Sequence, residues 1–116
     1  MALNNFPLAT PAAGSVTEAI TATASGNQAT GVQITTRYNR VSVCATNGDS
    51  VTLPPALVDE MIVIGNDGAA NLAVFPAVGE KIGSGAANAS FTVTAAKTAF
   101  FIGTGTPGKW AVVLSA

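Results

Sequence analysis

The chain has 116 residues, the size of one domain, and only 9% of them are charged, against about 25% in a typical soluble domain. The net charge is −1 and the five basic residues are scattered, which excludes a phosphate-binding groove for nucleic acid. There is no His and a single Cys, which excludes a His-based active site, an internal disulfide and a thiolate zinc site. We therefore expect no cofactor or metal, and a weakly charged surface that a partner has to cover.

Residues 1–14 are expected to form an extended N-terminal arm, and residues 15–116 a single β domain. The arm has two prolines and neither a helix nor a strand period. Leu3, Phe6 and Leu8 are too apolar for a free tail. Because chain ends become ordered only when they are tied down, these side chains pack either on their own domain or on another chain, such as a neighbouring subunit.

Neither a secretory signal nor a membrane segment is expected. Residues 1–11 lack a basic start and a continuous apolar stretch. The longest uncharged stretches, residues 19–36 and 82–96, contain too many Thr, Ser, Asn, Gln and Gly residues to cross a bilayer.

From Ser15 onward the sequence is typical of strands and turns, because Thr and Val are abundant and fit a pleated surface better than a helix. Alternation or short apolar runs predict strands over residues 16–24, 32–35, 40–46, 50–53, 61–64, 72–75, 80–82, 91–94, 98–102 and 109–114. The only helix candidate, residues 56–60, is hardly one turn long and is not predicted to be a helix. The continuous apolar run at residues 61–64 predicts a strand with both faces covered.

Short strands at spacings near ten residues predict an all-β fold, an antiparallel β-sandwich that is jelly-roll-like. The Asn47-Gly48-Asp49 turn predicts a hairpin, because Asn and Gly tolerate positive φ. No fixed-period repeat is evident. Alternation in residues 40–46 places Ser42, Cys44 and Thr46 on one face, which makes them candidates for a subunit interface. The Thr-rich face of residues 17–23 is the other candidate.

No motif supports an enzyme. Residues 103–108 match the glycine spacing of a nucleotide-binding loop, but a strand rather than a helix follows, and Pro107 removes an amide from the cradle. Asp59 and Glu60 are neighbours whose side chains point to opposite faces of an extended segment. Cys44 has no His to activate it. Trp110 alternates with apolar residues and is expected to anchor the core.

The stretch from Val51 to Leu114 resembles a small β module found in virion proteins of tailed bacteriophages. The residues that carry the resemblance are VTLPPA at 51–56, IVIGNDG at 62–68, LAVFPA at 72–77, GEKI at 79–82, Gly85, Phe100-Phe101 and GKW at 108–110. The opening NNFPL at residues 4–8 is similar to the start of small phage cement proteins. The pattern contains no catalytic residue, so none is carried over to this chain.

The resemblance implies a non-enzymatic head decoration, or cement, protein. Such a protein is made in the bacterial cytoplasm and binds the major capsid protein on the outer surface of the virion as a homotrimer, where it stabilises the coat lattice. Leu3, Phe6 and Leu8 would then contact the capsid or a neighbouring protomer. We expect no nucleic-acid or membrane partner.

Two alternatives stay open. A head-fibre or tail-fibre module would bind a host receptor or glycan, and Tyr38, between Arg37 and Asn39, is its one obvious aromatic candidate. A small hydrolase on a β scaffold is disfavoured by the missing His and the scattered carboxylates.

Overall fold

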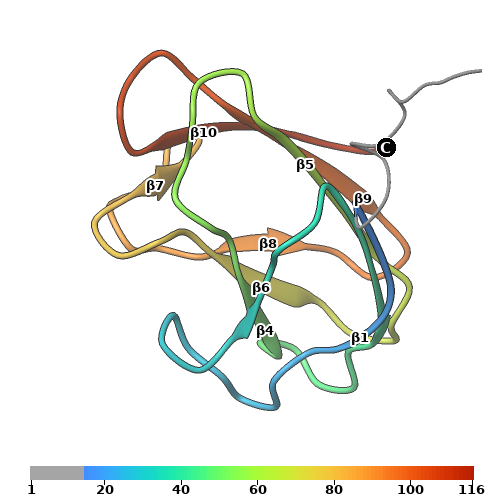
Figure 1. Ribbon diagram of the computed structural model, residues 1–116. Coiled ribbons are helices and arrows are strands. Elements are labelled where there is room, and N and C mark those ends of the chain that lie inside the picture. The colour runs from blue at the N-terminus through green and yellow to red at the C-terminus, as the bar shows by residue number, and fades with distance from the viewer. Residues whose placement is uncertain (1–14) are drawn as a thin grey trace, which may run out of the picture.

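The computed structural model describes residues 15–116, and within this range the chain forms ten strands and no helix. The strands are β1 (Val16–Thr21), β2 (Val32–Gln33), β3 (Tyr38–Val43), β4 (Ser50–Thr52), β5 (Met61–Asn66), β6 (Leu72–Phe75), β7 (Lys81–Ile82), β8 (Phe91–Val93), β9 (Thr98–Gly103) and β10 (Lys109–Leu114). One sheet has the order β1-β3-β5-β9-β10-β7 and the other the order β2-β4-β6-β8. The sheets lie face to face as two layers (Figure 1), which confirms an all-β sandwich.

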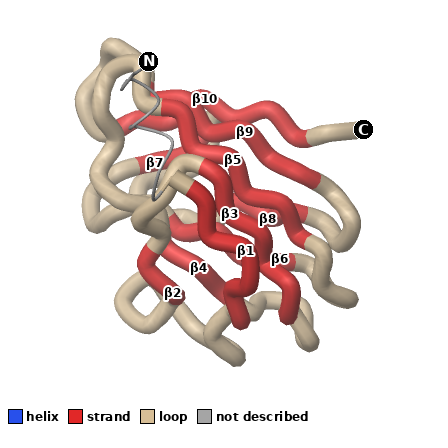
Figure 2. The backbone as a smooth tube through the Cα atoms, turned by 45° about the vertical axis from the view of Figure 1, so that its right-hand side comes forward, coloured by secondary structure: helices blue, strands red, loops and turns tan. Residues whose placement is uncertain are grey.

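The first six strands alternate between the two sheets, the odd strands in the larger sheet and the even strands in the smaller one (Figure 2). Each of the strands β1 to β4 pairs with the strand two positions further along the chain, and all four of these pairs are parallel. This part of the chain therefore winds as a coil with stacked turns, the arrangement of a parallel β-helix. Strands β8, β9 and β10 then join the sheets by antiparallel pairs, and β7 completes the larger sheet by pairing in parallel with β10.

Successive turns of the coil follow one another at a spacing of about two dozen residues. Six side-chain hydrogen bonds of the described residues join positions that are 24 apart, which ties each turn to the next. At one corner, Asn47 Oδ1 accepts the Asn71 N–H at 2.9 Å, and Asn71 Oδ1 accepts the Ala95 N–H at 3.2 Å. This ladder satisfies backbone donors at a corner where no strand partner is present.

Three expectations about topology are wrong. The sandwich is not antiparallel, because five of the eight strand pairs in residues 15–116 are parallel. The turn at Asn47 and Gly48 exists, with Gly48 at a φ of +96°, but it joins β3 and β4 of different sheets and makes no hairpin. A structural repeat exists although the sequence shows none. The jelly-roll-like arrangement is not confirmed, since jelly rolls are built from antiparallel pairs.

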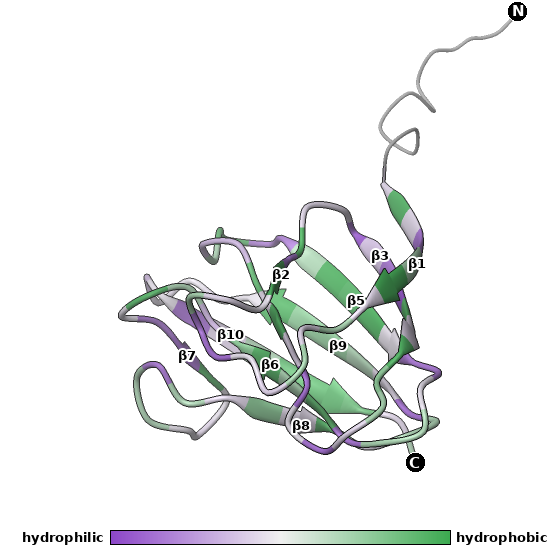
Figure 3. Cartoon of the chain, turned by 90° about the horizontal axis from the view of Figure 1, so that it is seen from below, coloured by the Kyte–Doolittle hydropathy of each residue, from purple (hydrophilic) through white to green (hydrophobic). Residues whose placement is uncertain are grey.

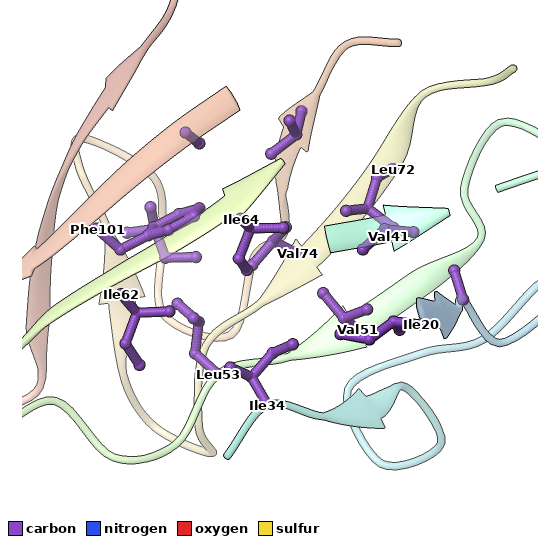
Figure 4. Packing of buried hydrophobic residues seen from close by; sticks show 14 of the residues in the cluster. Ile20, Ile34, Val41, Val51, Leu53, Ile62, Ile64, Leu72, Val74 and Phe101 are labelled. Atoms are coloured by element: carbon purple, nitrogen blue, oxygen red, sulfur yellow. The ribbon is translucent and has the colours of Figure 1, made fainter. Parts of the chain in front are cut away.

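One apolar cluster fills the space between the layers (Figure 4). Its large side chains from the six-stranded sheet are Ile20, Val41, Ile62, Ile64, Ile82, Phe101 and Trp110, and those from the four-stranded sheet are Val51, Leu72, Val74 and Val93. Each fully buried side chain of this size contributes roughly 1.5–3 kcal/mol. Trp110 is completely buried, as expected of a core anchor. Phe91 and Phe101 meet edge to face at 6.0 Å and join the two sheets.

Two buried polar side chains hold the coil at its corners. The amide of Asn66 donates to the carbonyl oxygens of Ala70 and Val93, and so links β5 to β8 across the layers. The carboxylate of Asp49, 3% exposed, accepts three backbone N–H groups, from Ser25 on the preceding turn and from its own β3–β4 corner. Because both groups are satisfied, their burial fixes the register of the turns rather than weakening the core.

Replacing Gly68 by Ala should destabilise the coil. A Cβ at Gly68 would lie 2.5 Å from the backbone nitrogen of Cys44 on the preceding turn, so the stacked turns would have to separate. We expect the free energy of unfolding to fall by roughly 1–3 kcal/mol, measured by chemical denaturation. The control is Gly105→Ala, because a Cβ there meets nothing within 4 Å. Equal stabilities of the two variants would contradict the close stacking.

Asp49 should make the fold sensitive to acid. Hydrogen bonds from the N–H groups of Thr46, Ser25 and Ala45 outweigh the effect of burial and hold the pKa of Asp49 below its usual value. The ionised form therefore stabilises the fold above the unfolded pKa of about 4, and this stabilisation is lost as the pH falls through the lower folded pKa.

The Asp49→Asn variant should have a lower melting temperature than the natural chain at pH 7, and the difference should shrink between pH 4 and pH 2. Thermal unfolding at a series of pH values measures it. Asp59→Asn is the matched control, since Asp59 lies exposed in a loop. If the difference in melting temperature between the natural chain and Asp49→Asn stays constant from pH 4 to pH 2, the negative charge of Asp49 does not stabilise the β3–β4 corner.

Candidate functional site

The outer face of the six-stranded sheet carries an apolar row that crosses five strands. The residues of the row are directly paired from β1 to β10, in the order Val16, Tyr38, Val63, Phe100 and Val113. Their neighbours along each strand, such as Ile62, Ile64 and Phe101, face the core and are buried. Since directly paired residues share one face of a sheet, the row forms a continuous line on the surface.

A second, shorter row lies beside the first. Met61 pairs with Ile102, and Ile102 pairs with Ala111, so this row crosses β5, β9 and β10. We call the two rows together the apolar band. Figure 3 colours β5 and β9, the strands at its centre, as hydrophobic along much of their length.

Most of the large side chains in the apolar band are strongly exposed. Val113 is 60% exposed, Met61 46% and Phe100 39%. Isolated exposed apolar residues are ordinary, but a contiguous group of large ones marks a surface that contacts a partner. The apolar run at residues 61–64 was expected to be covered on both faces, and this expectation is wrong for the chain alone, because Met61 points to solvent.

Charged groups flank the apolar band on one side. Arg40 follows Tyr38 by two residues on the same face of β3, and its Nε donates to Asp67 Oδ2 at 2.6 Å. The Arg40 guanidinium also donates to the carbonyl oxygen of Glu18 at 3.1 Å. This exposed ion pair adds little stability. It gives the apolar band a polar border, and a polar rim around an apolar centre is the common anatomy of a protein interface.

The outer face of the four-stranded sheet is different, because the chain covers part of it itself. Thr23 forms a bridge with Ser50, and the Thr52 hydroxyl donates to the carbonyl oxygen of Gln28 at 2.9 Å. The loop at residues 23–31 thereby buries Ser50 and Thr52. No comparable segment of residues 15–116 lies on the apolar band, so that face is the one left for a partner.

Tyr38 lies inside the apolar band rather than in a polar groove. Its hydroxyl passes close to Gly65, where an added Cβ would lie 3.6 Å from it. Val16 and Val63 flank Tyr38 in the row. A glycan site built on this ring would need polar groups on both sides of it, so the surroundings favour an apolar contact.

The structure separates the three residues expected to form a subunit interface. Cys44 is 1% exposed and belongs to the core, whereas Thr46 is exposed and Ser42 is half-buried. The alternation expected for residues 40–46 fails after Val41, because β3 ends at Val43 and the corner turns Cys44 inward. Burial leaves Cys44 almost no exposed surface in the chain alone, and the assignment of Ser42, Cys44 and Thr46 to an interface stays a prediction. The arm residues Leu3, Phe6 and Leu8 lie outside the described residues.

The remaining chemistry of the described residues is sparse. Burial, with a smaller contribution from the negative charge of Asp49, raises the pKa of the Cys44 thiol, so this thiol is not an activated nucleophile. Residues 15–116 contain no cluster of three Asp, Glu or Cys side chains that could hold a metal ion. No helix in this range is long and apolar enough to cross a membrane. The glycine-rich residues 103–108 are followed by strand β10 and not by the helix that a nucleotide-binding loop needs, as expected.

Comparison of the chain with protein-family models, with curated proteins and with solved structures finds no match. The apolar band is therefore argued from its own geometry. Sequence reasoning missed it, although alternation in β9 and β10 carried the signal. Phe100 and Ile102 alternate with buried residues and Val113 with half-buried ones, but assigning them to one surface requires the strand order.

Proposed function

We propose that this protein is a non-enzymatic structural component of a tailed-phage virion, a decoration protein that associates with copies of itself through the apolar band and binds the outer surface of the head. The single observation that supports self-association is the band itself, an unbroken apolar row on an otherwise weakly charged chain. The resemblance in sequence to phage virion modules supports the location and the trimeric state.

The size of the apolar band suits an association surface. Its seven large side chains are Val16, Tyr38, Met61, Val63, Phe100, Ile102 and Val113. Covering the exposed part of each contributes roughly 1 kcal/mol, or about 7 kcal/mol for each copy. Fixing two molecules relative to each other costs about 4–15 kcal/mol. The band therefore holds copies together only when it is covered fully, and a closed symmetric ring does this for every subunit.

On the head, the trimer would act as a passive clamp. A ligand that binds only the assembled lattice stabilises that lattice by mass action. At a free concentration 100-fold above its dissociation constant, each occupied site contributes roughly 2.7 kcal/mol. Many such sites would make a marginal shell resistant to heat and to the pressure of packaged DNA.

The purified chain should have a solution mass near three times 11.5 kDa. Placing a charge in the centre of the band, with Phe100→Glu, should shift the mass to that of one copy, because a buried unpaired carboxylate costs several kcal/mol. Light scattering across a dilution series measures both.

Thr92→Glu is the matched control, because Thr92 is an exposed residue of β8 in the other sheet. The control should keep the mass of the natural chain, and cooperative thermal unfolding of both variants should show that each is folded, with the monomeric Phe100→Glu melting at the lower temperature. A natural chain that is monomeric at every concentration, or that forms only pairs, would contradict the trimer.

Binding to the head should be visible directly. When the protein is added to expanded tailed-phage heads that were assembled without it, the protein should sediment with the heads. The heads should also withstand a higher temperature when the protein is bound. The Phe100→Glu variant should bind at least tenfold more weakly, since it presents one contact instead of three. Binding to a glycan panel, together with no binding to heads, would instead favour the fibre module.

A further inference from the structure

Four connections of the described chain lie together at one end of the coil. Because β2, β4 and β6 are parallel, the connections that follow them, residues 34–37, 53–60 and 76–80, are all at this end. β9 is antiparallel to β5, so the turn at residues 104–108 between β9 and β10 is there too. Figure 1 shows the connection before β5 and the turn before β10 projecting beside each other. We call these four connections the tip.

The tip exposes large apolar side chains. Leu57 and Val58, in the connection before β5, are both more than half exposed. Val78, in the connection before β7, is 84% exposed, more than any other large apolar side chain of residues 15–116. The two connections are neighbours, because Glu80 Oε1 accepts the Ala56 N–H at 2.9 Å. The three side chains therefore belong to one end surface.

The opposite end of the coil has no such side chains. Its connections are residues 44–49, 67–71 and 94–97, with the sequences CATNGD, DGAAN and TAAK. Every residue in these connections is small, polar or charged, and the thiol of Cys44 is buried. The two ends of the domain therefore differ in chemistry, although the same stacked turns form both.

The apolar loops of the tip are held in place by the rest of the domain. The Asp59 N–H donates to the carbonyl oxygen of Gly103 at 3.0 Å, and the Gly103 N–H donates to the carbonyl oxygen of Glu60 at 2.7 Å. These bonds fasten the connection before β5 to the end of β9. Prolines at positions 54, 55, 76 and 107 restrict the backbone further. A surface that is already ordered loses little conformational entropy when it binds.

Polar groups lie beside the apolar ones. A cleft of about 650 Å³ opens between the connections that follow β2 and β4, and its walls include Gln33, Arg37 and Glu60. Neither Arg37 nor Glu60 forms an ion pair with the described residues. An apolar group bordered by charged and polar groups is typical of a contact with another folded protein, which offers both kinds of partner.

The tip and the apolar band point in different directions. The band lies on the face of the six-stranded sheet, whereas the tip lies where the strands begin and end. A ring closed through the band covers the band of every copy. When the strands run along the axis of the ring, the tips of all copies lie on one side of it and stay uncovered. One side of the assembly is then apolar and the other polar, which suits a protein that attaches to a surface by one side.

We propose that the tip is the surface by which the assembled protein contacts the head, with Leu57, Val58 and Val78 packed against a weakly charged, apolar part of the coat surface. The proposal rests on the proposed function and adds the surface that meets the partner. It assigns the apolar band to contacts between copies and the tip to the contact with the coat.

Charge substitutions at the two ends of the coil test the proposal. Leu57→Glu and Val78→Glu each place a carboxylate on the tip, and Ala69→Glu places one at an exposed position of the opposite end. Expanded heads are titrated with each variant, and the bound protein is measured after sedimentation. Both tip variants should bind roughly tenfold or more weakly than the natural chain, because a buried carboxylate without a partner opposes the contact.

Two controls should bind as tightly as the natural chain. Ala69→Glu carries the same added charge away from the tip, and Val78→Ile keeps the tip apolar. Tip variants that bind heads as tightly as Ala69→Glu would overturn the proposal while leaving the proposed function in place. A natural chain that does not sediment with heads would instead contradict the proposed function, and this proposal with it.

Light scattering of the same variants separates a contact with the head from a contact between copies. The tip variants should keep the solution mass of the natural chain, because the apolar band is unchanged in them. A lower mass for Val78→Glu or Leu57→Glu would show that the tip joins copies of this chain, and it would overturn the proposal.

Discussion

The stacking of successive turns at intervals of about 24 residues is the constraint on which the rest of this structure depends. At Gly68 the absence of a side chain lets the backbone approach the backbone of Cys44 on the preceding turn. At the corner, the Asn47 side chain accepts the backbone N–H of Asn71 on the next turn. Stacked turns place every second strand in the same sheet, so the pairs are parallel. The core then fills from two layers whose inward residues come from the whole length of the chain.

The same stacking creates the apolar band. Val16, Tyr38 and Val63 occupy equivalent positions on successive turns, so one apolar residue on each turn is enough to form a continuous row. The antiparallel strands β9 and β10 extend the row with Phe100 and Val113. On the other sheet the chain covers Ser50 and Thr52 with its own loop, so the two outer faces have different roles. Because only 9% of the chain is charged, this open apolar face is where we propose that a partner binds.

Local patterns in the sequence predicted the fold class and most strands, because strand propensity and turn chemistry act over a few residues. The complete burial of Trp110 was predictable for the same reason. Topology was not, since the sequence around Asn47 and Gly48 gives the same turn whether the next strand pairs locally or crosses to the other sheet. The repeat was hidden because equivalent positions often carry different side chains, as Gly68 and Cys44 do, although Asn47 and Asn71 match.

A coil of stacked turns has two kinds of open surface, and they call for different partners. A free strand edge such as that of β2 presents backbone groups in an order that any extended segment matches. An apolar sheet face presents side chains instead, and it is covered by a surface of similar width. The face on which Phe100 and Ile102 lie crosses five strands, which is wider than one extended segment. The edge is therefore suited to a peptide segment, and the face to another folded surface.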